Sequence, residues 1–268
     1  VVLTTGPSTD DVLEMLVFDT FGVADTVSAK DGGSFVGAVS FGAGASVTGA
    51  LTTTAGATIA DGDLLLDGDS PEIIFQTGAS NYNWMIAAQE NVSNALEISS
   101  GGQDADYSND TWTTRLVVRN NGEVTTPTQP SFYAYPDGNI AVSNSTSLSV
   151  FAANTEIYDV GSNYNTSTYK FVAPVTGKYL IKWGFRLDSS DSGATYYYYR
   201  IYTSNRAYDQ IVKPTADETY TNPHNIAIVD LDANDEAYLQ YQQYSGTNNH
   251  ATIVSNSSLT YIQGMLIG

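Results

Sequence analysis

The sequence contains no cysteine, which excludes disulfide bonds and thiolate metal sites. Basic side chains are also few, because 10 Lys and Arg stand against 29 Asp and Glu and give a formal net charge of −19. A negative field of this size repels phosphate groups, so we expect neither nucleic acid nor an anionic membrane surface as a partner. No apolar run is long enough to span a bilayer, and we therefore expect no membrane insertion.

Helix-forming patterns are scarce as well, whereas residues typical of strands and turns are abundant. The chain has 19 Tyr and 23 Gly, and Thr, Ser and Asn are frequent. The composition predicts an all-β protein.

Catalytic motifs are also missing from the sequence. It has no Gly-x-Ser-x-Gly elbow, no His-Glu-x-x-His helix and no phosphate-binding loop. The two histidines, His224 and His250, lie in polar segments that we expect to be surface loops. Acidic residues are so frequent that a pair of carboxylates gives no indication of glycoside hydrolysis. We therefore expect that the protein is not an enzyme.

The most informative stretch covers residues 157–184 and reads IYDVGSNYNTSTYKFVAPVTGKYLIKWG. Ile181 and Trp183 alternate with polar or small residues, which predicts a half-buried strand. A second strand is expected just before Pro174. Pro174 and Gly177 suit a tight connection between the two, since Gly adopts backbone conformations that a Cβ disfavours. On periodicity alone, the stretch predicts a β-hairpin.

The same stretch resembles the core signature of the C1q-like jelly roll, a relative of the tumour necrosis factor fold. The family pattern is Tyr-Asn, then Phe-x-x-Pro, then Gly-x-Tyr leading into a long strand. It is matched here by Tyr164-Asn165, by residues 171–174 and by residues 177–179. Residues 225–240, with Asn234-Asp235 in a turn, and the closing residues 259–268 are similar to later strands of the family. The resemblance implies a jelly-roll head at 130–268 and a homotrimer.

A run of tyrosines within this head is the best lead to a ligand. Residues 196–202 read YYYYRIY, and in a strand Tyr196 and Tyr198 would share one face while Tyr197 and Tyr199 share the other. Tyrosine rings stack on sugars and bury a large area at low entropic cost. The candidate ligand-binding residues are Tyr197, Tyr199, Tyr202, Tyr241 and Tyr244. The alternative, that these rings pack the core or the trimer contact, stays open.

Acidic residues in the head raise the question of calcium, which oxygen-rich loops can bind. Asp188 and Asp191 are the candidate ligands. Asp is also common in turns for conformational reasons, so no cofactor is required by the sequence.

The N-terminal part predicts a fibrous architecture. Residues 1–30 contain short apolar stretches that indicate a small β-unit, with a helix near residues 10–16 as the alternative. Residues 31–66 carry a six-residue spacing at Phe35, Phe41, Val47, Thr53, Ile59 and Leu65. Such a repeat cannot bury its apolar residues alone, and three chains wound around one axis would bury them best. A flexible Gly/Ala/Thr linker is the alternative.

Residues 67–127 are expected to form a small β-module, with strands at 82–88, 95–99 and 115–119 and an Asn-Gly turn at 121–122. The run LLLDGDSPEIIFQ…WMIAAQ…ALEIS…TRLVVRNNGEV is similar to modules of bacteriophage tail fibres and spikes. Pro127 and Pro130 indicate a short, stiff linker to the head.

Together these features predict an extracellular virion fibre that attaches to a host cell. The trimeric head would bind a cell-surface glycan or protein, and the N-terminal part would contact other virion proteins. A structural virion protein without a receptor, such as a capsid fibre or tail connector, is one alternative. A secreted bacterial adhesin is another.

Overall fold

A computed structural model describes residues 51–53, 58, 62–78, 80–103 and 105–268. Within these residues the regular structure is β-strand, apart from one 3₁₀ turn, η1 (Tyr107–Asn109), which confirms the all-β prediction. The expected β-unit at 1–30 lies outside the described residues. So does most of the expected six-residue repeat at 31–66.

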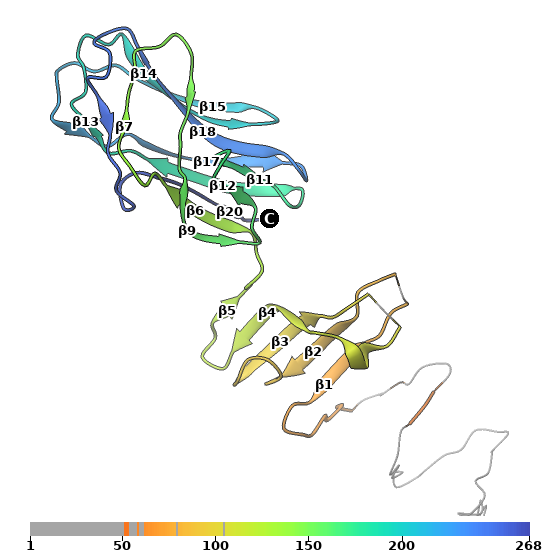
Figure 1. Cartoon of the computed structure of the whole chain (residues 1–268). Coiled ribbons are helices and arrows are strands. Elements are labelled where there is room, and N and C mark those ends of the chain that lie inside the picture. The colour runs from red at the N-terminus through yellow and green to blue at the C-terminus, as the bar shows by residue number, and fades with distance from the viewer. Residues whose placement is uncertain (1–50, 54–57, 59–61, 79, 104) are drawn as a thin grey trace, which may run out of the picture. The chain divides into compact units, whose positions relative to one another are not determined.

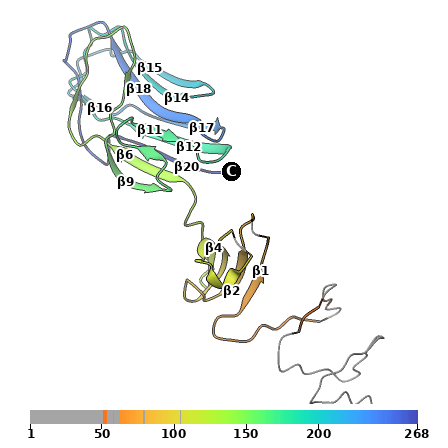
Figure 2. The same cartoon turned by 45° about the vertical axis from the view of Figure 1, so that its right-hand side comes forward.

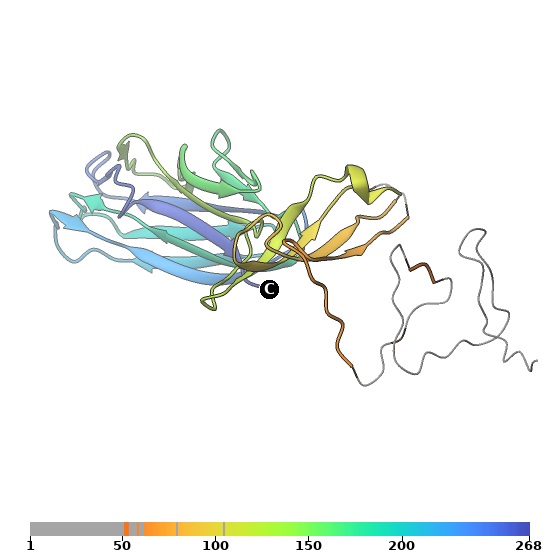
Figure 3. The same cartoon turned by 90° about the horizontal axis from the view of Figure 1, so that it is seen from below.

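A five-stranded antiparallel sheet precedes the head (Figure 3), and its strands follow the order β1-β2-β3-β4-β5 (Figure 1). Its strands are β1 (Glu72–Phe75), β2 (Trp84–Ala88), β3 (Ala95–Ser100), β4 (Thr113–Arg119) and β5 (Val124–Thr125). The strands predicted from the sequence in this segment are confirmed. The Asn-Gly turn between β4 and β5 is also confirmed, with Gly122 at a φ of 89°.

One carboxylate of this sheet is buried, and backbone amides and a hydroxyl donate hydrogen bonds to it. Glu97 of β3 is fully buried and accepts hydrogen bonds from the amides of Asn91 at 3.0 Å and Val92 at 2.7 Å. The Thr114 hydroxyl donates a third at 3.1 Å. Glu97 therefore holds the β2–β3 turn in place, because a buried carboxylate without such donors would be very costly.

The head is a sandwich of two antiparallel sheets (Figures 1 and 2). The first sheet has the order β17-β12-β20-β6-β9. Its strands are β17 (His224–Leu231), β12 (Gly177–Gly184), β20 (Tyr261–Leu266), β6 (Ser131–Tyr135) and β9 (Thr155–Val160). The second sheet has the order β10-β11-β18-β14-β15, and β8 also pairs with β18. Its strands are β10 (Tyr164–Asn165), β11 (Lys170–Val172), β18 (Glu236–Tyr244), β14 (Tyr196–Thr203), β15 (Ala207–Val212) and β8 (Ser149–Val150).

A smaller four-stranded sheet lies at one end of this sandwich (Figure 1). It has the order β16-β13-β19-β7, formed by β16 (Tyr220–Thr221), β13 (Leu187–Asp188), β19 (Thr252–Ile253) and β7 (Ile140–Ala141). Its four short strands lie within the long connections between strands of the main sheets, so their pairing holds these connections together.

Aromatic side chains fill the space between the two main sheets. Trp183 of β12 packs against Phe185 and Tyr199, with ring centroids 5.1 Å apart in both cases. Phe132 of β6 stacks on Phe171 of β11 at 4.8 Å and so joins the two sheets. Ile181 and Trp183 are both buried, which confirms the alternation predicted for this strand.

The predicted β-hairpin at 157–184 is wrong in its pairing. β11 pairs with β18 in one sheet, whereas β12 pairs with β17 and β20 in the other. The connection between β11 and β12 thus passes from one sheet of the sandwich to the other. Periodicity cannot distinguish such a crossing from a hairpin, because both join two alternating strands by a short turn.

The connection between β17 and β18 also passes between the two sheets, beside the first. Asn234 adopts a left-handed φ of 75° in this turn, which confirms the predicted turn at Asn234-Asp235. The Asn234 amide donates to the Ala173 carbonyl at 2.7 Å, and the Ala173 amide donates to the Asp235 carbonyl at 2.8 Å. The β11–β12 and β17–β18 connections are therefore joined to each other by backbone hydrogen bonds.

The role expected for Gly177 is also corrected. Gly177 is the first residue of β12 and is not among the described glycines with positive φ. A Cβ at this position would lie 2.8 Å from Leu266 Cδ1 and 2.9 Å from the Gly268 carbonyl oxygen. The position requires glycine because the C-terminal segment approaches closely, and not because of a turn conformation.

Candidate functional site

The tyrosines of β14 divide between the two faces of their strand as the sequence predicts. The burial along Tyr196–Thr203 alternates strictly between half-buried and buried residues. Tyr197 and Tyr199 point into the sandwich, whereas Tyr196, Tyr198 and Tyr202 point outward. The same strand therefore supplies both core and surface aromatics.

Three of the five candidate ligand residues lie inside the sandwich. Tyr197, Tyr199 and Tyr241 are buried, and desolvation raises the pKa of each of these phenols. The Tyr199 ring packs 5.1 Å from Trp183 and 5.5 Å from Phe185. Rings covered in this way present no face for a ligand to stack on at the outer surface. Their position corresponds to the packing alternative that the sequence left open.

The other two candidates, Tyr202 and Tyr244, lie on the outward side of the second sheet. We call the outward-facing Tyr196, Tyr198, Tyr202, Tyr238 and Tyr244 the tyrosine face. Tyr196 and Tyr244 are directly opposite each other on β14 and β18, and their rings stack at 5.0 Å with an interplanar angle of 10°. Tyr202 and Tyr238 form a second pair at 4.8 Å.

Charged side chains lie between and beside these two tyrosine pairs and form hydrogen bonds and ion pairs there. Arg200 Nε donates to Asp209 Oδ1 at 2.7 Å, and its Nη2 donates to the Tyr198 hydroxyl at 2.6 Å. The hydrogen bond from Arg200 lowers the pKa of Asp209. Lys170 lies 4.9 Å from the Tyr238 ring centroid and pairs with Glu236 at 2.8 Å. The face is thus an aromatic surface with its charges already paired.

The outward side of the other sheet is different in character. We call the outward-facing Tyr158, Leu180, Ile226, Ile228 and Met265 the assembly face. Ile226 and Ile228 are 53% and 59% exposed and lie on β17, the edge strand of this sheet. Ile228 is opposite Leu180, and Leu180 is opposite Met265, so these three side chains form one row across β17, β12 and β20.

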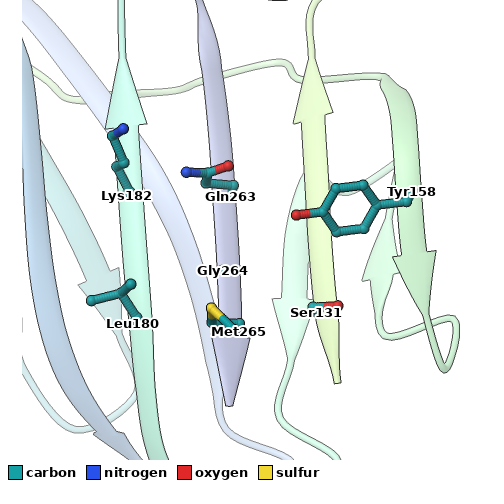
Figure 4. Close-up of a pocket in the computed structure, with 7 residues that line it drawn as sticks. All are labelled: Ser131, Tyr158, Leu180, Lys182, Gln263, Gly264 and Met265. Atoms are coloured by element: carbon teal, nitrogen blue, oxygen red, sulfur yellow. The ribbon is translucent and has the colours of Figure 1, made fainter. Parts of the chain in front are cut away.

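A shallow hollow of about 190 Å³ lies on the assembly face (Figure 4). Leu180 and Lys182 of β12 and Gln263 and Met265 of β20 line it, and the Tyr158 ring reaches toward them from β9. Lys182 Nζ lies 5.6 Å from the Tyr261 ring centroid. The surface is apolar with one cation over an aromatic ring, which suits contact with another protein surface.

The two calcium candidates are occupied by hydrogen bonds within the protein. Asp188 forms a bidentate pair with Arg186, at 2.8 and 2.9 Å. Asp191 accepts from the amides of Gly193 and Thr247, and the Thr247 amide lowers its pKa. In the described part of the chain, no three His, Asp or Glu side chains are grouped as metal ligands. The geometry explains Asp188 as the partner of Arg186 in β13 and Asp191 as a carboxylate that accepts hydrogen bonds from backbone amides of its own and a neighbouring loop.

The assembly face was not predicted as a site, although the sequence contains a signal for it. In residues 224–231 (HNIAIVDL), Ile226 and Ile228 alternate with Ala227 and Val229, so both faces of the strand are apolar. A strand that is apolar on both faces must be covered on both. The predicted surface loop at His224 is also corrected, since this residue begins β17.

Known proteins resemble the head of this chain. The globular domain of zebrafish complement 1qA matches at 12% identity and a TM-score of 0.39, covering 52% of this chain and 98% of that chain. Murine APRIL at pH 5.0 matches at 11% identity and a TM-score of 0.38, with 52% and 99% covered. Eiger TNF from S. frugiperda matches at 13% identity and a TM-score of 0.37, with 52% and 91% covered.

Comparison with curated proteins gives no match. In the described residues no helix is of a length and hydropathy that would cross a membrane. The C1q domain family matches residues 131–266, which confirms the resemblance noted in the sequence. This segment is just over half of the 268 residues, and the chain therefore belongs to the C1q domain family.

Proposed function

We propose that the protein is a virion fibre whose head assembles as a homotrimer and attaches to a glycan or protein on a host cell. The observation that carries the proposal is the assembly face, a row of apolar side chains that runs from the edge strand β17 across β12 to β20 and in which Ile228 and Met265 are exposed. Monomeric soluble proteins rarely leave such a row uncovered.

Domains of the C1q/TNF type are commonly trimeric ligand- or receptor-binding modules. They are typically non-enzymatic and typically extracellular or secreted. These family properties support a binding role for the head. They leave the ligand open, so the ligand must be argued from the surface of this chain.

The two sheets of the sandwich suit a division between assembly and binding. If the assembly face is covered by sister copies, the tyrosine face lies on the opposite sheet and stays open to a ligand. Three copies would then present three equal surfaces. Such an arrangement converts weak single contacts into strong attachment by raising the effective concentration of the second and third sites.

The fibre part of the proposal rests on the sequence. The six-residue spacing at 31–66, the β-unit expected from the sequence at 1–30 and the β-module at 67–127 suit a shaft that carries the head and joins other virion proteins. A trimeric shaft and a trimeric head would share one symmetry axis, which makes the two parts of the proposal consistent.

The assembly state is tested by the mass of the protein in solution. We expect light scattering to give three copies for the wild type and a smaller species for Ile226→Glu combined with Ile228→Glu, because a buried unpaired carboxylate opposes association. Ile211→Glu is the matched control, since Ile211 is 62% exposed on β15 of the other sheet. A folded wild-type protein with the mass of one copy would contradict the proposal.

Attachment is tested with labelled protein and a panel of bacterial strains. We expect the wild type and Ile211→Glu to bind a subset of strains strongly, and the dissociated double variant to bind the same strains much more weakly because avidity is lost. A protein that is trimeric but binds no strain in the panel would favour the alternative of a structural virion protein.

A further inference from the structure

A second surface of the head, separate from both faces, is a cavity of about 320 Å³ at the end of the sandwich, which we call the end cavity. It lies beneath the connection from β15 to β17. Its inner wall includes Leu187, Ser190 and Tyr199, and its apolar sides are formed by Val212, Pro214 and Pro223. The volume is at the lower end of the range for ligand pockets, which corresponds to one ring and not to a chain of several.

The connection over this cavity is held in place by defined hydrogen bonds. The amides of Ser189 and Ser190 donate to the carbonyls of Thr219 and Glu218 at 2.9 and 3.0 Å. The Ser192 amide donates to Asp217 Oδ1 at 2.7 Å. The cavity is therefore a preformed feature of the fold, which lowers the entropic cost of binding.

Its inner wall has hydrogen-bonding capacity that the protein does not use. Tyr199 is 2% exposed, and its hydroxyl has no hydrogen-bond partner among the described residues. By contrast, the buried Tyr197 hydroxyl accepts from the Asp191 amide at 2.9 Å and donates to Gln243 Oε1 at 3.3 Å. A hydroxyl in the wall of a cavity that has no partner in the protein is available to bond to a ligand or to water.

Ser190 adds a second hydroxyl to the same wall. It is 3% exposed, and its oxygen accepts from the Glu218 amide at 3.2 Å, while its own proton has no acceptor among the described residues. The wall thus offers two hydroxyls that can donate to a ligand. No charged side chain contributes to this inner wall, because Lys213 and Glu218 lie on the exposed connection.

We propose that the end cavity binds one neutral sugar ring, the terminal residue of the cell-surface glycan in the function proposed above, on which this inference rests. A sugar ring has apolar faces for Val212, Pro214 and Pro223 and hydroxyls for Tyr199 and Ser190. A purely apolar ligand would leave both protein hydroxyls without partners or water. A charged ligand would lose its hydration without an opposite charge in the inner wall.

A neighbouring hollow can hold the next sugar of such a glycan. It measures about 380 Å³, shares Thr221 and Asn222 with the end cavity, and is also lined by Tyr220, Arg186 and Leu259. Tyr220 is 68% exposed, so its ring is available for stacking on a second sugar.

The test titrates the full chain with methyl glycosides of glucose, galactose, mannose and N-acetylglucosamine, followed by saturation-transfer NMR. At least one of them should bind saturably, and Tyr199→Phe should weaken it about tenfold, the loss typical of one hydrogen bond. The melting temperature of this variant should not fall, since no internal hydrogen bond is lost. Tyr107→Phe is the matched control, because it removes the same atom from an exposed tyrosine of η1, outside the head and outside the lining of the cavity, and should leave the affinity unchanged.

A second variant keeps the test independent of Tyr199. Thr215→Trp on the exposed connection should fill the cavity and abolish binding. Tyr220→Ala should leave the affinity for the methyl glycoside unchanged. It should also remove the gain in affinity that the corresponding disaccharide shows over the methyl glycoside. The inference is overturned if none of the four glycosides saturates at about 50 mM, far above the millimolar affinity expected of so small a ligand. It is also overturned if binding survives both Tyr199→Phe and Thr215→Trp.

The outcomes separate this inference from the proposed function. If cells are still bound by Tyr199→Phe and Thr215→Trp, the cavity is not the attachment site, while trimeric attachment stands. If the free reducing sugar binds but its methyl glycoside does not, the ligand is a free monosaccharide and the assignment to a terminal glycan residue is wrong. If glycosides bind as expected but no strain is bound, the proposed attachment fails and the sugar site stands.

Discussion

At the scale of single residues, neighbouring tyrosines of β14 have opposite roles because a strand turns each successive side chain to the other face. Tyr199 contributes to the aromatic core with Trp183 and Phe185. Tyr198, one position away, lies outside and bonds to Asp209 and Arg200. Substitutions at Tyr199 and Tyr198 should therefore have different effects on the free energy of unfolding.

Tyr199→Ala should lower the free energy of unfolding by about 3–5 kcal/mol, the range for removing a large buried aromatic side chain. Tyr198→Ala should cost about 1 kcal/mol, because its ring is only half-buried. Chemical denaturation of both variants measures the difference. Equal losses at the two positions would contradict the assignment of Tyr199 to the core and Tyr198 to the surface.

The Arg200–Asp209 pair predicts a dependence of stability on acid. Its hydrogen bond lowers the pKa of Asp209 below the ordinary 3.8, so the folded state binds the proton more weakly than the unfolded state. The contribution is therefore fully present above about pH 4 and is lost as the pH falls through the lowered pKa. In urea titrations from pH 6 to pH 2, Asp209→Asn should lose less stability than the wild type. Identical profiles would show that the pair contributes nothing, as for many exposed ion pairs.

At the scale of elements, the head depends on short connections that cross from one sheet to the other. The β11–β12 and β17–β18 connections bond to each other through Ala173, Asn234 and Asp235. The close approach of the C-terminal segment to Gly177 lies next to them, where Lys178 and Gly268 share a backbone hydrogen bond of 2.5 Å. A larger side chain at Gly177 therefore has little room beside these connections.

Gly177→Val should destabilise the head by about 1–3 kcal/mol through overpacking against Leu266 and the Gly268 carbonyl. Thermal unfolding followed by near-ultraviolet circular dichroism would report the loss. Gly138→Val is the control, since a Cβ at Gly138 meets nothing within 4 Å. A normal melting temperature for Gly177→Val would mean that the C-terminal segment moves away without cost.

At the scale of the whole molecule, the net charge of −19 opposes the proposed association of three copies. The assembly face is apolar, so its attraction does not depend on salt-sensitive ion pairs between copies. Raising the salt from about 10 mM to 500 mM shortens the screening length several-fold and should strengthen the trimer. Sedimentation velocity at low protein concentration would measure this change. Weaker association at high salt would instead indicate an interface held by ion pairs.

The sequence by itself determined the all-β class, most strand positions and the C1q-like resemblance of the head, expected at 130–268 and matched by the family at 131–266. These features are local: alternation reports burial strand by strand, and a motif such as Phe171 to Pro174 with Gly177 to Tyr179 can be recognised without partners. It also assigned Tyr196 and Tyr198 to one face and Tyr197 and Tyr199 to the other.

Only the tertiary structure decided which face is the core and which strands pair. A period of two is the same in a hairpin and in a crossing, so β11 and β12 were paired wrongly, and the reason for Gly177 became visible only from Leu266 and Gly268. The end cavity needs Ser190, Tyr199 and Pro214 side by side, and residues this far apart in sequence are brought together by sheet packing. Pairing and burial are long-range properties, which local sequence patterns do not contain.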